Sequence, residues 1–204
     1  MTHPAPKPPR RRNPRNTRER LVRASLDLFT SQGYHETTTP QIAARAGVAE
    51  GTIYRHFASK DLLLNELYRA GVRRLQRVIA ESKGTARERL EAVATDWRDV
   101  AVKDPALVRM VFDGRFDHLL DERSRTAWGE LRGALESLVA SGKSQGEVRP
   151  GGALVWAEFW LASLRLLLLR VALGQWKPDE AAIRLVLDGA WRALAPTQPH
   201  QETS

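Results

Sequence analysis

The chain has 204 residues, a formal net charge of +8 and no cysteine. This length suffices for one or two domains with a buried core, and the lack of cysteine excludes disulfides, thiolate metal ligands and cysteine nucleophiles. Because no apolar stretch opens the sequence, it predicts no secretory signal and a cytoplasmic location.

The charge is distributed unevenly along the chain. Residues 1–60 hold eleven basic and four acidic side chains, so they carry +7, whereas the remainder carries only +1 and all six tryptophans. A basic front and a neutral, tryptophan-rich back indicate two tasks, of which the first faces a polyanion such as nucleic acid. The alternative is that the arginine-rich front only keeps the protein soluble.

The first predicted helix follows a basic arm. Residues 1–15 combine proline with arginine and cannot build a core, so we expect a disordered arm. Asn16 can cap a helix with Glu19 as its capping-box partner, and Gly33 ends that helix.

Two short helices and a long one follow. Thr38 or Thr39 caps the second helix with Pro40 in its first turn, and Gly47 ends it. A third short helix comes next, and Ser59 then caps a long helix that runs to about Ala80. The residues expected on the inner side of the two short helices and their turn are Ile42, Ala43, Ala46, Val48, Ile53, Tyr54 and Phe57.

Only helical patterns follow Gly84, so the predicted fold class is all-α. The expected helices are 86–102, 105–112, 118–141, 152–173 and 178–194. The domains would be 16–60 and 61–195, with a disordered tail at 196–204. The apolar run 153–173 contains Glu158, Arg165 and Arg170, which makes a buried helix far more favourable than a membrane span.

The informative stretch is a short helix, a glycine-containing turn and a second short helix, which is a helix-turn-helix. The second of these helices carries polar or very small residues, as a helix laid in the major groove of DNA requires. Hydroxyl and basic side chains nearby can donate to phosphate oxygens. The candidate DNA-binding residues are Thr38, Thr39, Glu50, Gly51, Thr52, Tyr54, Arg55, His56 and Lys60.

About 45 residues from Asn16 onward resemble the tetracycline-repressor (TetR) family. The matching positions are Gly33, Tyr34, Thr37, Thr38, Ile42, Ala43, Ala46, Gly47, Val48, Gly51, Thr52, Ile53, Tyr54, Phe57, Ser59, Lys60 and Asp61. The resemblance implies a homodimer with one recognition helix per subunit. Phosphate contacts would come from Thr38, Tyr54, His56 and Lys60, and base contacts from Glu50, Gly51, Thr52 and Arg55. The sequence departs from the family at Ala49, where serine is usual, and at Pro40.

The second domain is rich in large aromatic residues. They are Trp97, Phe112, Phe116, Trp128, Trp156, Phe159 and Trp160, and they predict either a plain core or a pocket for an apolar or aromatic effector. We expect Trp156, Phe159, Trp160 and Ser163 to share one helix face. The resemblance implies that effector binding weakens the hold on DNA, so the hypothesis is a repressor released from its operator by a small molecule.

The competing hypothesis is a helical small-molecule-binding protein or enzyme with an incidental basic tail. Asp113, Asp117, His118 and Asp121 could hold a metal, but a solvated helix start explains them more simply. No Ser-His-Asp pattern has a recognisable context. We therefore expect no catalytic site, cofactor or metal.

Overall fold

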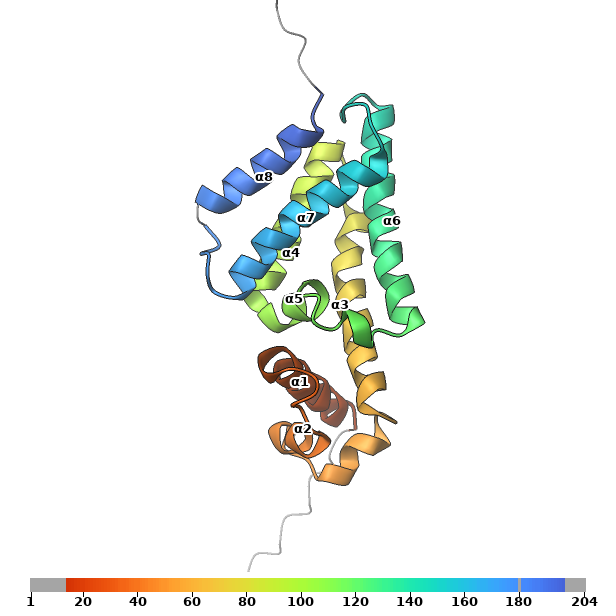
Figure 1. Ribbon diagram of the computed structural model, residues 1–204, viewed down its shortest axis with the longest axis vertical. Coiled ribbons are helices and arrows are strands. Elements are labelled where there is room, and N and C mark those ends of the chain that lie inside the picture. Colours follow the sequence, from red (N-terminus) through yellow and green to blue (C-terminus); the bar gives the residue numbers. More distant parts are fainter. Residues whose placement is uncertain (1–13, 180, 197–204) are drawn as a thin grey trace, which may run out of the picture. The chain divides into compact units, whose positions relative to one another are not determined.

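The computed structural model describes residues 14–179 and 181–196. The regular elements of these residues are all helices, so the fold is all-α, as predicted. The chain divides into two compact units between Leu63 and Leu64 (Figure 1). Most of the expected arm, residues 1–13, and most of the expected tail, residues 197–204, lie outside the described residues.

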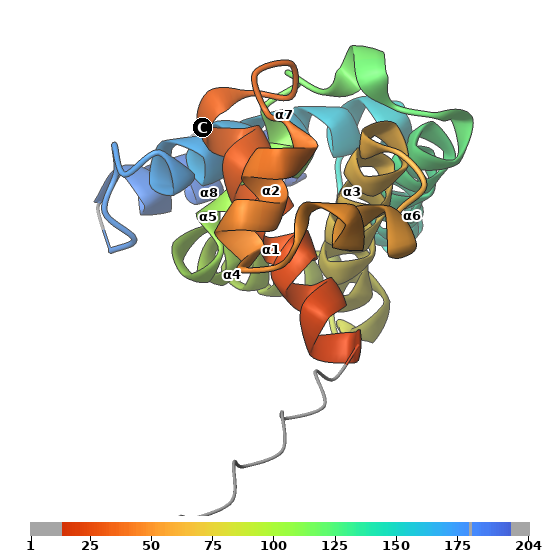
Figure 2. The ribbon, with the colours of Figure 1, turned by 90° about the horizontal axis from the view of Figure 1, so that it is seen from below.

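The first unit holds α1 (Pro14–Gln32), α2 (Thr39–Ala46), the 3₁₀ helix η1 (Glu50–Arg55) and the start of α3 (Lys60–Glu81). Helices α1 and α2 pack against each other, and η1 follows α2 closely (Figure 2). Apolar side chains from all four elements form the core of this unit: Leu21, Phe29, Ile42, Ala43, Ile53, Phe57 and Leu63.

Two details of this unit differ from the prediction. Helix α1 begins at Pro14, so Asn16 lies inside its first turn rather than capping it; proline fits a first turn because its φ is already helical and it lacks the N–H that would have no partner there. Tyr54 was expected on the inner side, yet its side chain is 57% exposed. The predicted third helix is a 3₁₀ helix, and in it Tyr54 points away from the buried Ile53, with its hydroxyl 3.0 Å from that of Thr39.

The second unit contains the rest of α3 and five further α-helices. These are α4 (Ala86–Lys103), α5 (Pro105–Phe112), α6 (Glu122–Ser144), α7 (Ala153–Ala172) and α8 (Ala181–Leu194), with the 3₁₀ turn η2 (Asp117–Leu119) before α6. Helix α7 packs against α4, α5, α6 and α8, so it is the central helix of this unit (Figure 1). None of the described helices is long and apolar enough to cross a membrane.

Side-chain caps explain where α6 starts. It was expected from His118, but Asp121 accepts a hydrogen bond from the Ser124 N–H at 2.7 Å, so the helix begins at Glu122. Helix α8 likewise starts at Ala181 rather than at Pro178, which lies in the preceding turn.

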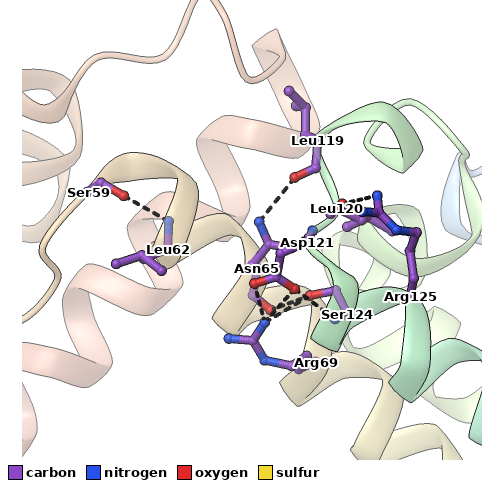
Figure 3. Close-up of polar contacts among 9 residues, drawn as sticks. All are labelled: Ser59, Leu62, Asn65, Arg69, Leu119, Leu120, Asp121, Ser124 and Arg125. Atoms are coloured by element: carbon purple, nitrogen blue, oxygen red, sulfur yellow. Dashed lines mark hydrogen bonds and ion pairs between the residues drawn. The ribbon is translucent and has the colours of Figure 1, made fainter.

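A polar network anchors the segment between η2 and α6 to α3 (Figure 3). The Asn65 side chain donates to the Leu119 carbonyl at 3.1 Å and accepts from the Asp121 N–H at 2.8 Å. Arg69 forms an ion pair with Asp121 at 2.9 Å and donates to the Ser124 hydroxyl at 3.0 Å. Because these bonds join α3 to both sides of residue 120, they fix the position of the connecting segment.

Most of the predicted aromatic residues belong to the core of this unit. Trp97 is fully buried, donates to the Leu75 carbonyl at 2.9 Å and packs against Phe112 and Trp160. The expectation that Phe159 and Trp160 share a face is wrong, since Trp160 is buried whereas Phe159 is 45% exposed. The sequence could not resolve this point because α7 is apolar on nearly all sides.

Candidate nucleic-acid interface

The amino end of α2 is closed by a reciprocal capping box. The Thr38 hydroxyl accepts from the Gln41 N–H at 3.4 Å, and the Gln41 side chain accepts from the Thr38 N–H at 2.9 Å. Thr38 is therefore the cap, and Thr39 is the first residue of the helix. Since the capping side chain is exposed, the positive end of the helix dipole opens towards solvent, where a phosphate can approach it.

The turn after α2 depends on Gly47. Its φ of 62° is left-handed, and the Val48 N–H bonds back to the Ala43 carbonyl at 3.0 Å, which closes the helix. Arg20 of α1 donates to the carbonyls of Ala46 and Gly47. A Cβ at Gly47 would lie 2.8 Å from Arg20 Nη2, the far end of a flexible side chain, so it is the left-handed backbone angle that requires glycine. Sequence reasoning missed Arg20, whose partners lie 26 and 27 residues away.

The element η1 follows this turn, and its outward side carries the candidate base-reading residues. Glu50, Gly51 and Arg55 are exposed, and Thr52 is half-buried. No atom lies within 4 Å of where a Cβ of Gly51 would be, so the backbone there is open to close approach. Ala49 precedes the element without a side-chain cap, as its methyl side chain dictates.

The start of α2 and the middle of η1 meet through two hydroxyls. Thr39 Oγ1 and Tyr54 Oη lie 3.0 Å apart, within hydrogen-bond distance, and both belong to the predicted DNA-binding set. The pair sits at the exposed end of α2, beside the Thr38 cap. The structure thus gathers Thr38, Thr39 and Tyr54 into one polar edge, while Arg55 follows directly on η1.

Lys60 occupies a different setting from the other candidates. Its ammonium donates to the carbonyls of Tyr34 and Thr37, both at 2.9 Å, and lies 4.0 Å from the centroid of the Tyr34 ring. The Tyr34 hydroxyl donates to Asp61, and its pKa is raised by burial and by that carboxylate. Lys60 therefore holds the loop between α1 and α2 in place, and its contact with phosphate remains a prediction. His56 is half-buried beside Phe57.

The described residues hold no group of three metal-ligating side chains. Of the acidic cluster considered from the sequence, Asp113 pairs with Arg115 and Asp121 caps α6.

Comparisons with known proteins agree with this geometry. The family model for bacterial regulatory proteins of the tetR family matches residues 21–67. TcmR of Streptomyces glaucescens, an HTH-type transcriptional regulator, is 50% identical over 52 residues, which are 26% of this chain and 23% of TcmR. The nucleoid occlusion factor SlmA of Serratia proteamaculans is 27% identical over 188 residues, or 89% of this chain and 94% of SlmA.

The transcriptional repressor KstR2 of Rhodococcus jostii is 29% identical over 144 residues, which cover 64% of this chain and 69% of KstR2. Among solved structures, the ketosteroid transcriptional regulator KstR2 of Mycobacterium tuberculosis aligns with a TM-score of 0.69 at 21% identity, covering 87% of this chain and 94% of that one. TcmR and KstR2 are both named as regulators of transcription. The helix-turn-helix region of this chain is therefore similar to that of the tetR family of bacterial regulatory proteins.

Proposed function

We propose that the protein is a homodimeric repressor that occupies an operator through η1 and the start of α2 and is released by a small-molecule effector. The observation that carries the DNA-binding part is the polar edge formed by Thr38, Thr39 and Tyr54 next to the exposed side of η1. Hydroxyls and a helix amino end suit phosphate oxygens, whereas Thr52 and Arg55 suit base edges.

An exposed apolar stripe on α7 supports the proposal that the protein is a homodimer. Val155, Phe159 and Leu166 are exposed and follow one another by four or seven residues, so they line one side of the helix. The exposed Leu173 follows directly after the last residue of the helix. On α8, Leu185 is 73% exposed, while Ile183, Ala190 and Leu194 face the core. An apolar surface of this kind is unfavourable in water, and pairing α7 and α8 with their copies would cover it as a four-helix bundle.

A cavity in the second unit supports the proposal that a small-molecule effector binds there. It measures about 330 Å³ and is lined by residues of α3, α5, α6 and α7, among them Phe112 and Trp128 from the predicted aromatic set. The other five predicted aromatics do not line it. This volume lies at the small end of the range for ligand sites.

The DNA-binding part can be tested without knowing the operator. The full chain is incubated with a pool of randomised duplexes, and bound DNA is amplified and sequenced over several rounds. We expect enrichment of a palindromic site, because two identical subunits present identical recognition elements. If no sequence is enriched, sequence-specific binding fails. In transcription assays, a promoter carrying the selected site should be silenced, and activation would contradict repression.

A further inference from the structure

We propose that the effector is an organic acid: an anionic group held by Tyr68 and Arg165, attached to an apolar body of about two aromatic rings. This inference rests on the proposed function, because it specifies the ligand of the same cavity.

The cavity has a buried floor and a charged rim. Tyr68, Val111 and Phe112 form the floor and are almost wholly buried. Arg125, Arg132 and Arg165 line it together with a single carboxylate, Asp117, which leaves the lining with a formal charge of +2. Because Arg132 forms an ion pair with Glu158 at 2.5 Å, one of these charges is already matched. The remaining excess is positive and favours a ligand with one negative charge.

Two polar groups in the cavity have their hydrogen-bonding capacity to spare. Tyr68 is 2% exposed, yet its hydroxyl forms no hydrogen bond with any residue in 14–179 or 181–196. Arg165 likewise has no hydrogen bond or ion pair to a described residue, although it interrupts the most apolar helix of the protein. Arg165 is exposed, and the Tyr68 hydroxyl is not sealed off from the space of the cavity, so a ligand that enters the cavity can bond both groups.

The surroundings keep the Tyr68 hydroxyl protonated and leave room for the Arg165 guanidinium. Burial raises the pKa of Tyr68 and Asp117 raises it further, while Arg165 acts in the opposite direction, so the hydroxyl remains a protonated donor. Gly114, with a φ of 81°, lets Arg165 approach, since a Cβ there would lie 3.1 Å from Arg165 Nη2. Arg165 and a phenolic O–H can then bond the two oxygens of one carboxylate.

The rest of the cavity suits an apolar body. Phe112 and Trp128 pack edge to face with ring centroids 5.8 Å apart, and both line the space. A cavity of about 150 Å³ accepts benzene, so 330 Å³ corresponds to roughly two rings. Gly129 lies in the middle of α6, where glycine weakens a helix, and no atom lies within 4 Å of where its Cβ would be. Its missing side chain leaves room that a ligand can fill.

The test compares acids with their uncharged amides. Calorimetric titration of the full-length protein with benzoate, 2-naphthoate and decanoate, and with the corresponding primary amides, isolates the negative charge. We expect 2-naphthoate to bind at least tenfold more tightly than 2-naphthamide. Arg165→Gln should remove that preference, and Tyr68→Phe should reduce acid affinity several-fold. Arg170→Gln, on the same helix but outside the cavity, is the matched control and should bind like the unmodified protein.

Filling the cavity provides an independent variant. Gly129→Leu should abolish binding of every compound while the helix content stays unchanged, whereas Gly133→Leu on the same helix should leave binding intact. If no acid binds more tightly than its amide, or if Arg165→Gln leaves the preference unchanged, the proposed ligand class is wrong.

Operator affinity, measured separately, distinguishes this failure from failure of the proposed function. Acid binding without any change in operator affinity would refute effector release and leave the ligand class standing. Release of the operator by an amide but not by its acid would refute the ligand class and leave effector release standing.

Discussion

Two side chains of η1 are expected to contact base edges. Their removal should lower the affinity for the operator more than the affinity for unrelated DNA. Thr52→Val and Arg55→Ala each delete a polar group at the exposed side of the element while Ile53 and Phe57 keep the core intact. We expect each to weaken binding to the selected operator by about 1–3 kcal/mol. Gel shifts with operator and unrelated DNA measure this difference. Unchanged operator affinity in both variants would mean that η1 is not the recognition element.

Tyr54 should behave differently because its hydroxyl pairs with Thr39 at the edge of α2. A phosphate contact carries no sequence information, so Tyr54→Phe should weaken operator and unrelated DNA alike, by about 1 kcal/mol. Because the side chain is 57% exposed, thermal stability should hardly change. A loss confined to the operator would assign Tyr54 to base recognition instead.

Residue-level reasoning from the sequence works where the signal is local. Thr38 and Ser59 cap helices as predicted, and Gly47 adopts the left-handed turn that its position after Ala46 requires. Lys60 and Arg20 show the limit, since their partners are backbone carbonyls more than twenty residues away. No spacing rule connects such groups, because the tertiary packing of α1 on α2 creates the contact.

At the scale of an element, the start of α6 combines a cap with an ion pair. Burial alone would raise the pKa of Asp121, but the hydrogen bonds from Ser124 and the Arg69 guanidinium outweigh it and lower that pKa. The carboxylate therefore stabilises the folded state above the ordinary Asp pKa of about 3.9, and this contribution is lost as pH falls through the lower folded-state value.

Replacing Asp121 by asparagine should expose that dependence. Asn caps helices as well as Asp does, so Asp121→Asn removes only the charge, and we expect a cost of about 1 kcal/mol at pH 7, because solvent screens this half-exposed pair. Urea unfolding from pH 7 down to pH 3 should show the difference shrinking below about pH 4. Glu91→Gln, in the exposed pair with Arg87, is the control and should change stability little. A difference that persists in acid would mean that the charge is not the cause.

Element bounds can be predicted where local signals set them, whereas the face that a helix buries depends on its tertiary neighbours. Caps and prolines in the sequence place the start of α5 at Pro105, as predicted, and the carboxylate of Asp104 completes that start. The face that α7 presents is not encoded in its own periodicity, because nearly every side of it is apolar. Which side is covered depends on α4, α5, α6 and α8, and this is why Phe159 and Trp160 separate.

At the scale of the molecule, DNA affinity should depend on residues that never touch DNA. Phe159→Glu places a charge in the exposed stripe of α7, where a dimer would bury it without a partner. We expect the unmodified protein to scatter light as twice the 22.9 kDa of one chain, and the variant as a single chain. Val102→Glu, at a similarly exposed apolar position on α4, is the matched control and should remain dimeric.

The same variant links assembly to function. Two recognition elements held on one dimer bind a palindrome with an effective concentration that a monomer lacks, so separating them should lower operator affinity by roughly 10²-fold or more. Affinity for a single half-site should stay as it is, because η1 and α2 are unaltered. Operator binding by a monomeric Phe159→Glu variant at undiminished affinity would show that one helix-turn-helix suffices, and the stripe on α7 would then need another explanation.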